Sequence, residues 1–587
     1  MKGLSRVAWP SVVFAIALAV FSVSVTRSHL ALDDWGYVYG CPFVKDGLSW
    51  ANVRAAFTTL GHGGIWMPLT YMTYMVDISA FGQGWIAHHA VNVVLHALNA
   101  VLLLHFAAAV AGRLLPEGRG VSMAACAVAT LLWACSPVRA EAVAWVASRK
   151  EELWTLFALC GLMVWVRWLE KGRLSFYAAS LVFFALASLS KPTAMCLAPL
   201  ALIVHALVAG KTRRVGFCWY LPVFAIAAAT GAIAIFSQTH PEGAAPVEIY
   251  TAPFWWRLLN ASVASGVYLL QSAVPFGVYF DWREIPGGWP LWSVAGLAAL
   301  ALALAALVMV LRRAADRGLR RIALFAALWF AASLLPVLGI FGAVGDNALA
   351  CRYAYLPSMA VAAVAAYVLS AVKRPRVRAA SLFAATALAA ANAALAANAA
   401  RSFENDETLA ERTLEHDPDN WRALRTLGRT LAAREGRMDE GIDMLKRSLA
   451  LRRSQLTADS LAYLLACRGA DGDFDEVRRM AKAVRKRPGL DRSGMMHDAL
   501  GVVEMREGDW ELAAKDFSAS LVAPERTYTN IHTMLNLGLS LANAGKRADA
   551  VLILVKLRGV ADRQVRDRAL EALDVIKSRR PCRFEWR

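Results

Sequence analysis

Long apolar runs separated by short polar segments dominate the first 400 residues of the chain. A helix of about 20 apolar residues is long enough to cross the hydrocarbon core of a bilayer. Eleven runs approach this length, so we predict an all-α, polytopic membrane domain with about eleven transmembrane helices. The predicted spans are 8–26, 90–111, 121–136, 150–169, 175–190, 192–209, 217–237, 291–311, 321–341, 355–372 and 379–398.

A further apolar segment, Phe254 to Val274, is ambiguous. If it crossed the membrane, the arginine-rich loop 312–321 would lie on the opposite side from the other basic loops. We therefore predict an interfacial or re-entrant helix here. The first run follows Lys2 and Arg6, as in a secretory signal, but it lacks a convincing cleavage site. We predict that this run stays in the membrane.

Lys and Arg residues predict the orientation, because basic residues in short loops stay in the cytoplasm. Nineteen of them fall in alternate loops with only three acids, and they account for most of the net charge of +18. Little positive charge remains for a nucleic-acid-binding patch, so we expect no nucleic acid partner. The outer side then holds loops 27–89, 238–290 and 342–354 and the carboxy-terminal region. The basic loops are 2–6, 113–119, 167–173, 211–214, 312–321 and 373–378.

The first outer loop holds two stretches with amphipathic helical spacing, Gly47 to Phe57 and Trp66 to Phe81. Both suit helices that lie flat in the membrane interface. Ordinary packing helices of a small cap are the alternative. Either arrangement would surround the start of this loop.

The second span carries polar residues on one helix face. His89, Asn92, His96 and Asn99 follow one another at spacings of three or four residues, with His88 at the edge of the same face. Polar residues inside a membrane usually face a cavity or a partner helix. We predict that they either bind substrate or form hydrogen bonds between helices.

Two adjacent acids, Asp33 and Asp34, follow the first span closely. Near a low-dielectric membrane the charged form of a carboxylate is disfavoured, which raises its pKa and makes it a competent proton acceptor near neutral pH. We predict that this pair is catalytic. Solvated loop acids that cap a helix are the alternative. A divalent cation on the pair is also chemically sensible, because hard oxygen ligands suit Mg or Mn.

A Ser-Pro stop after the third span opens a short outer segment that ends at Glu152. Its composition predicts a helix at the membrane surface, with Glu141 and Arg149 two turns apart on nearly the same side. Lys191 lies in a hairpin at the outer boundary, and Arg352 and Tyr353 lie at the outer face.

Five cations thus gather on the side of the acids. Such a group predicts a polyanionic ligand such as a phosphate, because Arg and Lys hold phosphates through charge-assisted hydrogen bonds. Each cation alone is also explained as a side chain that reaches to the membrane surface. The five are Arg139, Arg149, Lys150, Lys191 and Arg352.

From Arg401 onward apolar runs give way to mixed charge, which divides the chain into a membrane domain, 1–400, and a soluble domain, 401–587. Small-residue positions recur in the second part at spacings typical of tetratricopeptide repeats. We predict an α-solenoid whose groove binds an extended peptide or protein, with a structural cap as the alternative. The repeat positions are Leu427-Gly428, Leu500-Gly501 and Leu537-Gly538, with Ala513, Phe517, Ala550 and Leu554; 456–488 and 402–418 are a degenerate unit and a half repeat.

Seven motifs follow one another ahead of these repeats: LDDWGYVYG, GLSWANVRAAF, WMPLTYMTY, HHAVNVVLHALNAVLL, SPVRAEAVAWVASRKEEL, LSKPTA and CRYAYLP. Their order, together with the repeats, resembles the transmembrane-and-tetratricopeptide O-mannosyltransferases and their bacterial relatives, within the GT-C class of glycosyltransferases. The resemblance covers nearly the whole chain. It rests on the order of the motifs and the domain layout, since no single motif is specific.

The resemblance implies a multispan enzyme with a polyprenyl-phosphate-linked sugar as donor and an outer-loop acid, Asp33 or Asp34, as catalytic base. The chain departs from the family pattern at Ser136, where a His is usual, and at Glu151 and Glu152, where an Asp is more usual. We carry over no role for these positions.

We therefore expect an inverting glycosyltransferase on the outer face of a membrane, with the bacterial inner membrane and periplasm as its location. Lys191, Arg352 and Arg149 are the expected contacts to the donor phosphate, and the acceptor is a hydroxyl, first of all a protein Ser or Thr. His89, Asn92, His96, Glu141 and Tyr353 are expected to bind substrate or to be structural.

Three other functions stay open: transfer to a lipid or polysaccharide, a transporter that uses the acids as its coupling site, and an assembly protein that acts through its repeats. The sequence has no nucleotide-binding glycine loop, which favours a lipid-linked donor. A disulfide among Cys41, Cys351, Cys467 and Cys582 is also left open, since spacing alone pairs none of them.

Overall fold

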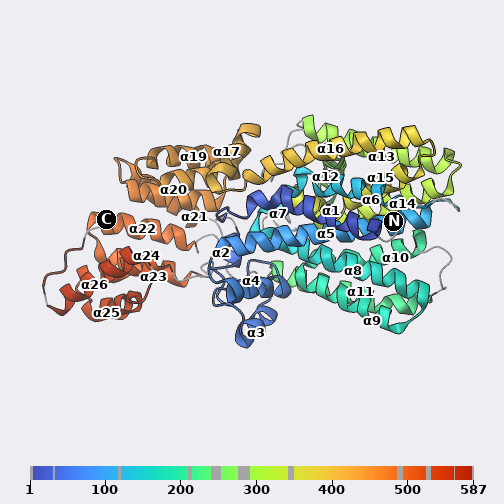
Figure 1. Ribbon diagram of the computed structural model, residues 1–587. Helices are drawn as coiled ribbons and strands as arrows, with labels where there is room; N and C mark the ends of the chain where they lie inside the picture. The colour runs from blue at the N-terminus through green and yellow to red at the C-terminus, as the bar shows by residue number, and fades with distance from the viewer. Residues whose placement is uncertain are drawn as a thin grey trace. The chain divides into compact units, whose positions relative to one another are not determined.

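A computed structural model describes residues 4–30, 33–116, 120–208, 215–239, 253–274, 291–340, 349–485, 493–523, 530–560, 562–578 and 580–584. Every regular element in these ranges is a helix, as predicted. The chain divides into two compact units, the first ending at His416 and the second beginning at Asp417 (Figure 1). The expected boundary, between 400 and 401, lies earlier than this division, at the end of helix α16 (Pro375–Arg401). Most of the predicted outer loop 238–290 lies outside the described residues.

The apolar helices of the first unit coincide with the eleven predicted spans. Among the described residues, six helices are long and apolar enough to cross a membrane, and a bent pair would make a seventh. The six are α5 (Trp85–Leu114), α8 (Arg149–Lys171), α11 (Leu221–Thr239), α13 (Leu291–Arg313), α14 (Arg317–Leu334) and α16 (Pro375–Arg401); the bent pair is α6 (Met123–Ala134) with η2 (Pro137–Arg139) and α7 (Ala140–Ala144).

Four shorter apolar helices occupy the other predicted spans. They are α1 (Leu4–Phe21), α9 (Leu174–Ser190), η4 (Pro192–Cys196) with α10 (Leu197–Leu207), and α15 (Met359–Ala371). Pro192 follows Lys191 directly, and a proline at this place starts a new helix because its fixed φ suits the first turn. The break between α9 and η4 therefore holds Lys191 at the ends of two helices.

The ambiguous segment forms α12 (Phe254–Ala273), which packs along α13. Gly266 and Gly296 let the two backbones come close, since a Cβ on Gly266 would lie 1.7 Å from the Gly296 carbonyl oxygen. Helix α12 is not among the candidate membrane spans of the described residues. An interfacial or re-entrant position for it stays a prediction.

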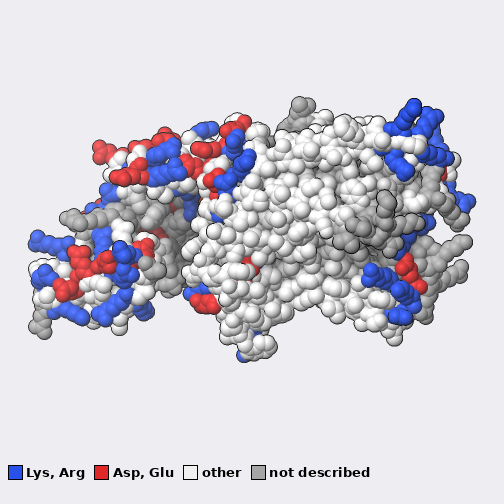
Figure 2. Space-filling model, in the orientation of Figure 1, with Lys and Arg blue, Asp and Glu red and all other residues white. Residues whose placement is uncertain are grey.

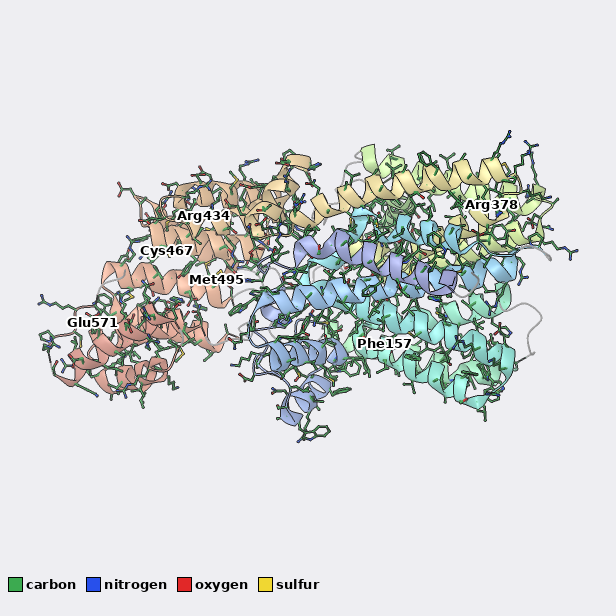
Figure 3. All side chains as sticks on the ribbon, viewed as in Figure 1. Phe157, Arg378, Arg434, Cys467, Met495 and Glu571 are labelled. Carbon is green, nitrogen blue, oxygen red and sulfur yellow. The ribbon has the colours of Figure 1, made fainter. Side chains whose placement is uncertain are left out.

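Helices α5 and α8 run in the same direction and give the first unit two distinct ends. At one end Arg149 of α8 reaches the start of α5, and at the other Arg113 of α5 pairs with Glu170 of α8. Figure 2 shows almost no charged side chains over the middle of this unit and a cluster of Lys and Arg at one end. Arg378 lies at that basic end, and Phe157 of α8 lies away from it (Figure 3).

The first outer loop folds into three helices at the start of α5 and α8. They are α2 (Asp34–Tyr37), α3 (Trp50–Thr58) and α4 (Pro68–Phe81). Helix α4 buries Tyr71, Tyr74 and Met75 and packs on α5, α8 and α9. It is therefore a packing helix of the cap. Helix α3 keeps Trp50 exposed, so a contact of this helix with the membrane interface stays open.

The second unit consists of helix pairs of the predicted repeat kind. A Cβ on Gly501 would lie 2.9 Å from the Phe517 ring, and one on Gly538 would lie 2.6 Å from Leu554. The small residue in the first helix of each pair therefore makes room for a large side chain of the second helix. The pairs are α18 (Trp421–Ala432) with α19 (Met438–Leu451), α20 (Gln455–Arg468) with α21 (Asp473–Arg485), α22 (Gly494–Glu507) with α23 (Trp510–Val522), and α24 (Ile531–Asn543) with α25 (Arg547–Leu554), followed by α26 (Arg563–Lys577).

Candidate active site

The two acids at the start of the outer loop have different environments. Asp34 is fully buried, and its carboxylate accepts hydrogen bonds from the backbone N–H of Leu30 at 2.9 Å and of Ala147 at 2.7 Å. Asp33 is half-buried at the N-terminal boundary of α2, and its side chain makes no cap hydrogen bond. Neither acid is therefore a solvated helix cap. Asp34 ties its own loop to the segment before α8, whereas Asp33 keeps its carboxylate partly exposed.

Burial raises the pKa of Asp34 to about 7, although its two backbone hydrogen bonds oppose this shift. The cause is the loss of hydration around the charged form, which favours the neutral acid. The raised pKa that was expected from the sequence thus occurs at Asp34.

Lys150 connects the acids to the predicted cations. Its ammonium donates to the Ala147 carbonyl at 2.9 Å, one peptide away from the N–H that binds Asp34, and it lies 4.6 Å from the centre of the Tyr37 ring. Its electrostatic neighbours are Asp33, Arg352, Lys191 and Glu151. Lys150 is buried, so these charges act on each other with little screening by solvent.

Lys191 and Arg352 meet around Tyr353. The Lys191 ammonium lies 5.3 Å and the Arg352 guanidinium 4.9 Å from the centre of the Tyr353 ring. Each cation is buried and paired with a carboxylate: Lys191 with Glu151, and Arg352 with Glu141. The structure thus brings Asp33, Asp34, Lys191 and Arg352 into one group. Glu141 also accepts a hydrogen bond from the Arg352 backbone N–H at 2.9 Å, which fixes its place in the fold.

The predicted surface helix that contains Glu141 and Arg149 is wrong. Helix α7 ends at Ala144, Trp145 is extended with ψ of 117°, and η3 (Val146–Ser148) precedes α8. The break turns the Ala147 N–H toward Asp34, which a continuous helix would prevent. The segment is also buried and does not lie on the surface.

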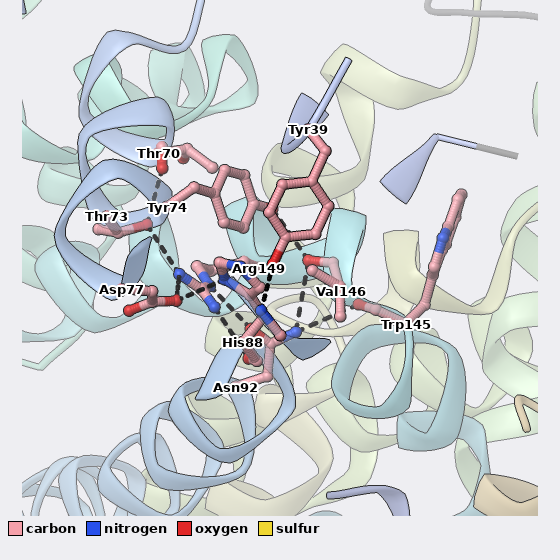
Figure 4. A network of polar contacts seen from close by, with 11 residues as sticks. Tyr39, Thr70, Thr73, Tyr74, Asp77, His88, Asn92, Trp145, Val146 and Arg149 are labelled. Atoms are coloured by element: carbon pink, nitrogen blue, oxygen red, sulfur yellow. Dashed lines mark hydrogen bonds and ion pairs between the residues drawn. The ribbon is translucent and has the colours of Figure 1, made fainter. Parts of the chain in front are cut away.

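Arg149 lies in a separate network, shown in Figure 4. Its guanidinium pairs with Asp77 at 2.6 Å and donates to the Asn92 side chain at 2.9 Å and the His88 carbonyl at 2.8 Å. It also lies 4.4 Å from the centre of the Tyr74 ring. Since Arg149 is fully buried among these partners, it suits holding α4 against α5 and α8 better than contact with a donor phosphate.

The polar face of α5 makes hydrogen bonds between helices. Asn92 donates to the Trp145 carbonyl at 3.2 Å, and Asn99 donates to the Glu152 carbonyl at 2.9 Å. His96 lies 3.1 Å from the Ala134 carbonyl and 2.8 Å from the Tyr355 hydroxyl, and His89 lies 3.1 Å from the Ser28 carbonyl. Of the two roles that the spacing left open, the structure supports the structural one.

Three acids near the site had no role assigned from the sequence. Asp77 is the only charged residue between Trp66 and Phe81, which was the one available signal. Glu151, the partner of Lys191, follows Lys150 in α8. Asp406, at the start of α17 (Asp406–His416), is an electrostatic neighbour of Asp34, although more than 370 residues separate them. Only the tertiary structure brings this acid to the site.

Within the described ranges, no three His, Cys, Asp or Glu side chains form a group that could hold a metal ion. A divalent cation on Asp33 and Asp34 stays an expectation. All nine cysteines are free, so the disulfide left open by the sequence is absent from the structure.

No family model matches the chain, but comparison with known proteins finds similar sequences. The chain is similar to protein O-mannosyl-transferases. It is 26% identical to protein O-mannosyl-transferase TMTC4 of Mus musculus over 416 residues, which are 62% of this chain and 55% of that protein. It is 28% identical to TMTC1 of Mus musculus over 153 residues and 31% identical to TMTC1 of Homo sapiens over 124 residues. These two matches cover 25% and 21% of this chain and 15% and 13% of the relatives.

Proposed function

We propose that the protein is an inverting glycosyltransferase that moves a sugar from a polyprenyl-phosphate-linked donor to a hydroxyl acceptor. The observation that carries the proposal is the grouping of Asp33 and Asp34 with buried cations at one end of the apolar unit. The similarity to proteins named as protein O-mannosyl-transferases supports the same chemistry. A protein Ser or Thr is the first expected acceptor, and a lipid or polysaccharide is the alternative.

Asp33 is the proposed base, because its carboxylate is partly exposed while that of Asp34 is enclosed by two backbone N–H groups. Asp33 takes the proton of the acceptor hydroxyl as the oxygen attacks the anomeric carbon, on the face opposite the phosphate. The bond between that carbon and the phosphate oxygen breaks in the same step. Lys191 and Arg352 stabilise the negative charge that develops on the leaving phosphate.

Glu141 and Glu151 hold these two cations in place, since each carboxylate pairs with one of them. Asp34 and Arg149 are proposed to position the site: Asp34 fixes Ala147, and Arg149 fixes α4. No step of this mechanism needs a metal. Transfer in the presence of EDTA tests the alternative of a Mg or Mn ion on the acids.

The repeat unit is proposed to bind the protein or peptide that carries the acceptor hydroxyl, as helix-pair arrays bind extended chains. The site and the repeats are assigned to the outer, periplasmic side of a bacterial inner membrane. This assignment is supported by the basic loops at the opposite end of α5 and α8 from the acids.

The decisive experiment is a transfer assay with the Asp33→Asn variant. A positioned general base contributes about 10² to 10⁴ in rate, and Asn keeps the size of Asp without its basicity. We expect a loss of this size, measured with a radiolabelled sugar on polyprenyl phosphate, while the level of protein in the membrane stays normal. Asp46→Asn, in the same outer loop, is the control and should transfer normally. Full transfer by Asp33→Asn, Asp34→Asn and the double variant would remove the proposal and favour a transporter or an assembly protein.

The orientation has its own test. A reporter that is active only in the cytoplasm should work when fused after Arg376 and fail when fused after Asp471, because α16 crosses the membrane between them. Cytoplasmic activity at Asp471 would mean that the number of spans is wrong by an odd number, and it would separate the repeats from the acids by the membrane.

A further inference from the structure

An aromatic cluster adjoins the acids in the first outer loop. Four rings form it: Trp35 in α2, Tyr39 just after α2, His29 from the loop before α2, and Trp85 at the start of α5. We name it the aromatic platform. His29 stacks on Trp85 at 4.6 Å with an angle of 15° between the rings, Tyr39 meets Trp85 at 4.8 Å, and Trp35 lies 6.0 Å from Tyr39.

The fold leaves Trp35 exposed at the surface of the protein. Trp35 is 51% exposed, although it directly follows the fully buried Asp34. Gly40 makes room for it, since a Cβ there would lie 3.0 Å from the Trp35 ring. The Tyr39 hydroxyl accepts a hydrogen bond from the Gly84 N–H at 2.6 Å, which fixes the next ring of the platform. Trp35 is thus exposed beside three half-buried rings, and its plane is tilted by 58° from that of Tyr39.

Charged and polar groups border the platform. Glu404, after α16, pairs with Arg27 at 2.7 Å and accepts a hydrogen bond from the Ser28 hydroxyl through its carbonyl. Asp406 is an electrostatic neighbour of both His29 and Asp34. Glu404 keeps 45% of its side chain exposed, so this border is in contact with water. A surface that only touched lipid would not place hydrated carboxylates beside its rings.

We propose that the aromatic platform is a subsite for a pyranose ring of the acceptor. The apolar C–H face of a pyranose packs on an aromatic face, and its hydroxyls form hydrogen bonds with carboxylates, so flat rings bordered by Glu404 and Asp406 match both parts of a sugar. The place also fits: Trp35 directly follows Asp34, and Asp406 is an electrostatic neighbour of both Asp34 and His29. We assign the platform to the acceptor because it adjoins the acids, whereas the donor phosphate is assigned to the cations.

This inference rests on the proposed function and narrows it, because the acceptor then carries a sugar beside the hydroxyl that is glycosylated. The transferred sugar forms its new bond at the acceptor oxygen near Asp33. The sugar on the platform is neither cut nor modified. It orients the acceptor, so its loss should raise the KM for the acceptor more than it lowers kcat.

The test is binding of free sugars to the full chain in lipid nanodiscs that contain no glycoside detergent. Saturation-transfer NMR with α-linked mannotriose and with chitotriose should detect transfer to the sugar ring protons in the absence of donor. Trp35→Ala should weaken the affinity for these sugars about 3- to 10-fold, which corresponds to the free energy of one aromatic contact. Trp35→Phe should retain part of this affinity. Trp50→Ala is the matched control, since Trp50 is 83% exposed but lies outside the platform.

Equal binding by Trp35→Ala and the wild type would overturn the subsite, as would an equal loss in Trp50→Ala. His29→Ala gives a second measurement if Trp35→Ala fails to fold. Quenching by brominated lipid that disappears in Trp35→Ala would show that the ring faces lipid, and this would also overturn the proposal. The assay contains no donor, so it is independent of Asp33. Normal sugar binding with full transfer by Asp33→Asn, Asp34→Asn and the double variant would refute the proposed function alone.

Discussion

Two kinds of ion pair, one near the site and one in the repeat unit, use the same residue types in opposite environments. Near the site, Arg149 and Asp77 are 0% and 5% exposed, and Lys191 and Glu151 are 8% and 2% exposed. In the repeat unit, Arg437 and Glu440 are 38% and 56% exposed. A buried charge without a partner is costly, whereas an exposed pair contributes little. The two buried pairs are therefore structural requirements of a charged centre, and the Arg437–Glu440 pair is an ordinary surface contact.

Arg149→Met should have the largest effect on stability. The change keeps the apolar stem and leaves Asp77 buried without its main counter-charge, which costs about 3 to 5 kcal/mol. We expect a clearly lower melting temperature and yield of the purified protein. Arg437→Met removes the same group from an exposed pair and should leave both unchanged. Similar behaviour of the two variants would mean that the Asp77 network does not hold α4 in place.

The helices and repeats could be predicted from the sequence because their signals are local. Apolar runs of sufficient length mark the spans, and Gly501 and Gly538 mark contacts within single helix pairs. Asp33, Asp34, Lys191 and Arg352 could be placed together because all four lie in loops assigned to one side. Their carboxylate partners could not be predicted in this way. Glu141 and Arg352, for example, are 211 positions apart.

The break before α8 shows why local signals fail at the site. The residues from Ala140 to Glu152 are mostly good helix formers, and their composition predicts a single helix. The chain instead turns at Trp145 so that the Ala147 N–H can bind Asp34. The free energy of a hydrogen bond to a buried carboxylate thus outweighs helix propensities of a few tenths of a kcal/mol per residue.

Lys191→Met and Arg352→Met should affect the donor more than the acceptor. A hydrogen bond to a charged group contributes about 1.5 to 3 kcal/mol, so each variant should lower kcat/KM for the polyprenyl-phosphate sugar about 10- to 100-fold. Arg113→Met, at the other end of the unit, is the control and should leave this kcat/KM unchanged. An unchanged kcat/KM for the donor in both site variants would remove the phosphate contacts and leave the two cations with a structural role alone.

The smallest expected effect is a pH dependence of stability at Asp34. Its pKa is about 7 in the folded protein because of burial, and about 3.9 in an unfolded chain. Between these values the folded state binds more protons than the unfolded state, so stability falls as the pH rises through this window and is constant above it. Asp34→Asn lacks this titration. The melting temperature of the wild type minus that of Asp34→Asn should therefore decrease between pH 5 and pH 8, by about a few degrees. Asp46→Asn, in the same loop, should show no such trend. A constant difference across this range would mean that Asp34 stays ionised. The hydrogen bonds from the Leu30 and Ala147 N–H groups would then offset the desolvation of its charged carboxylate.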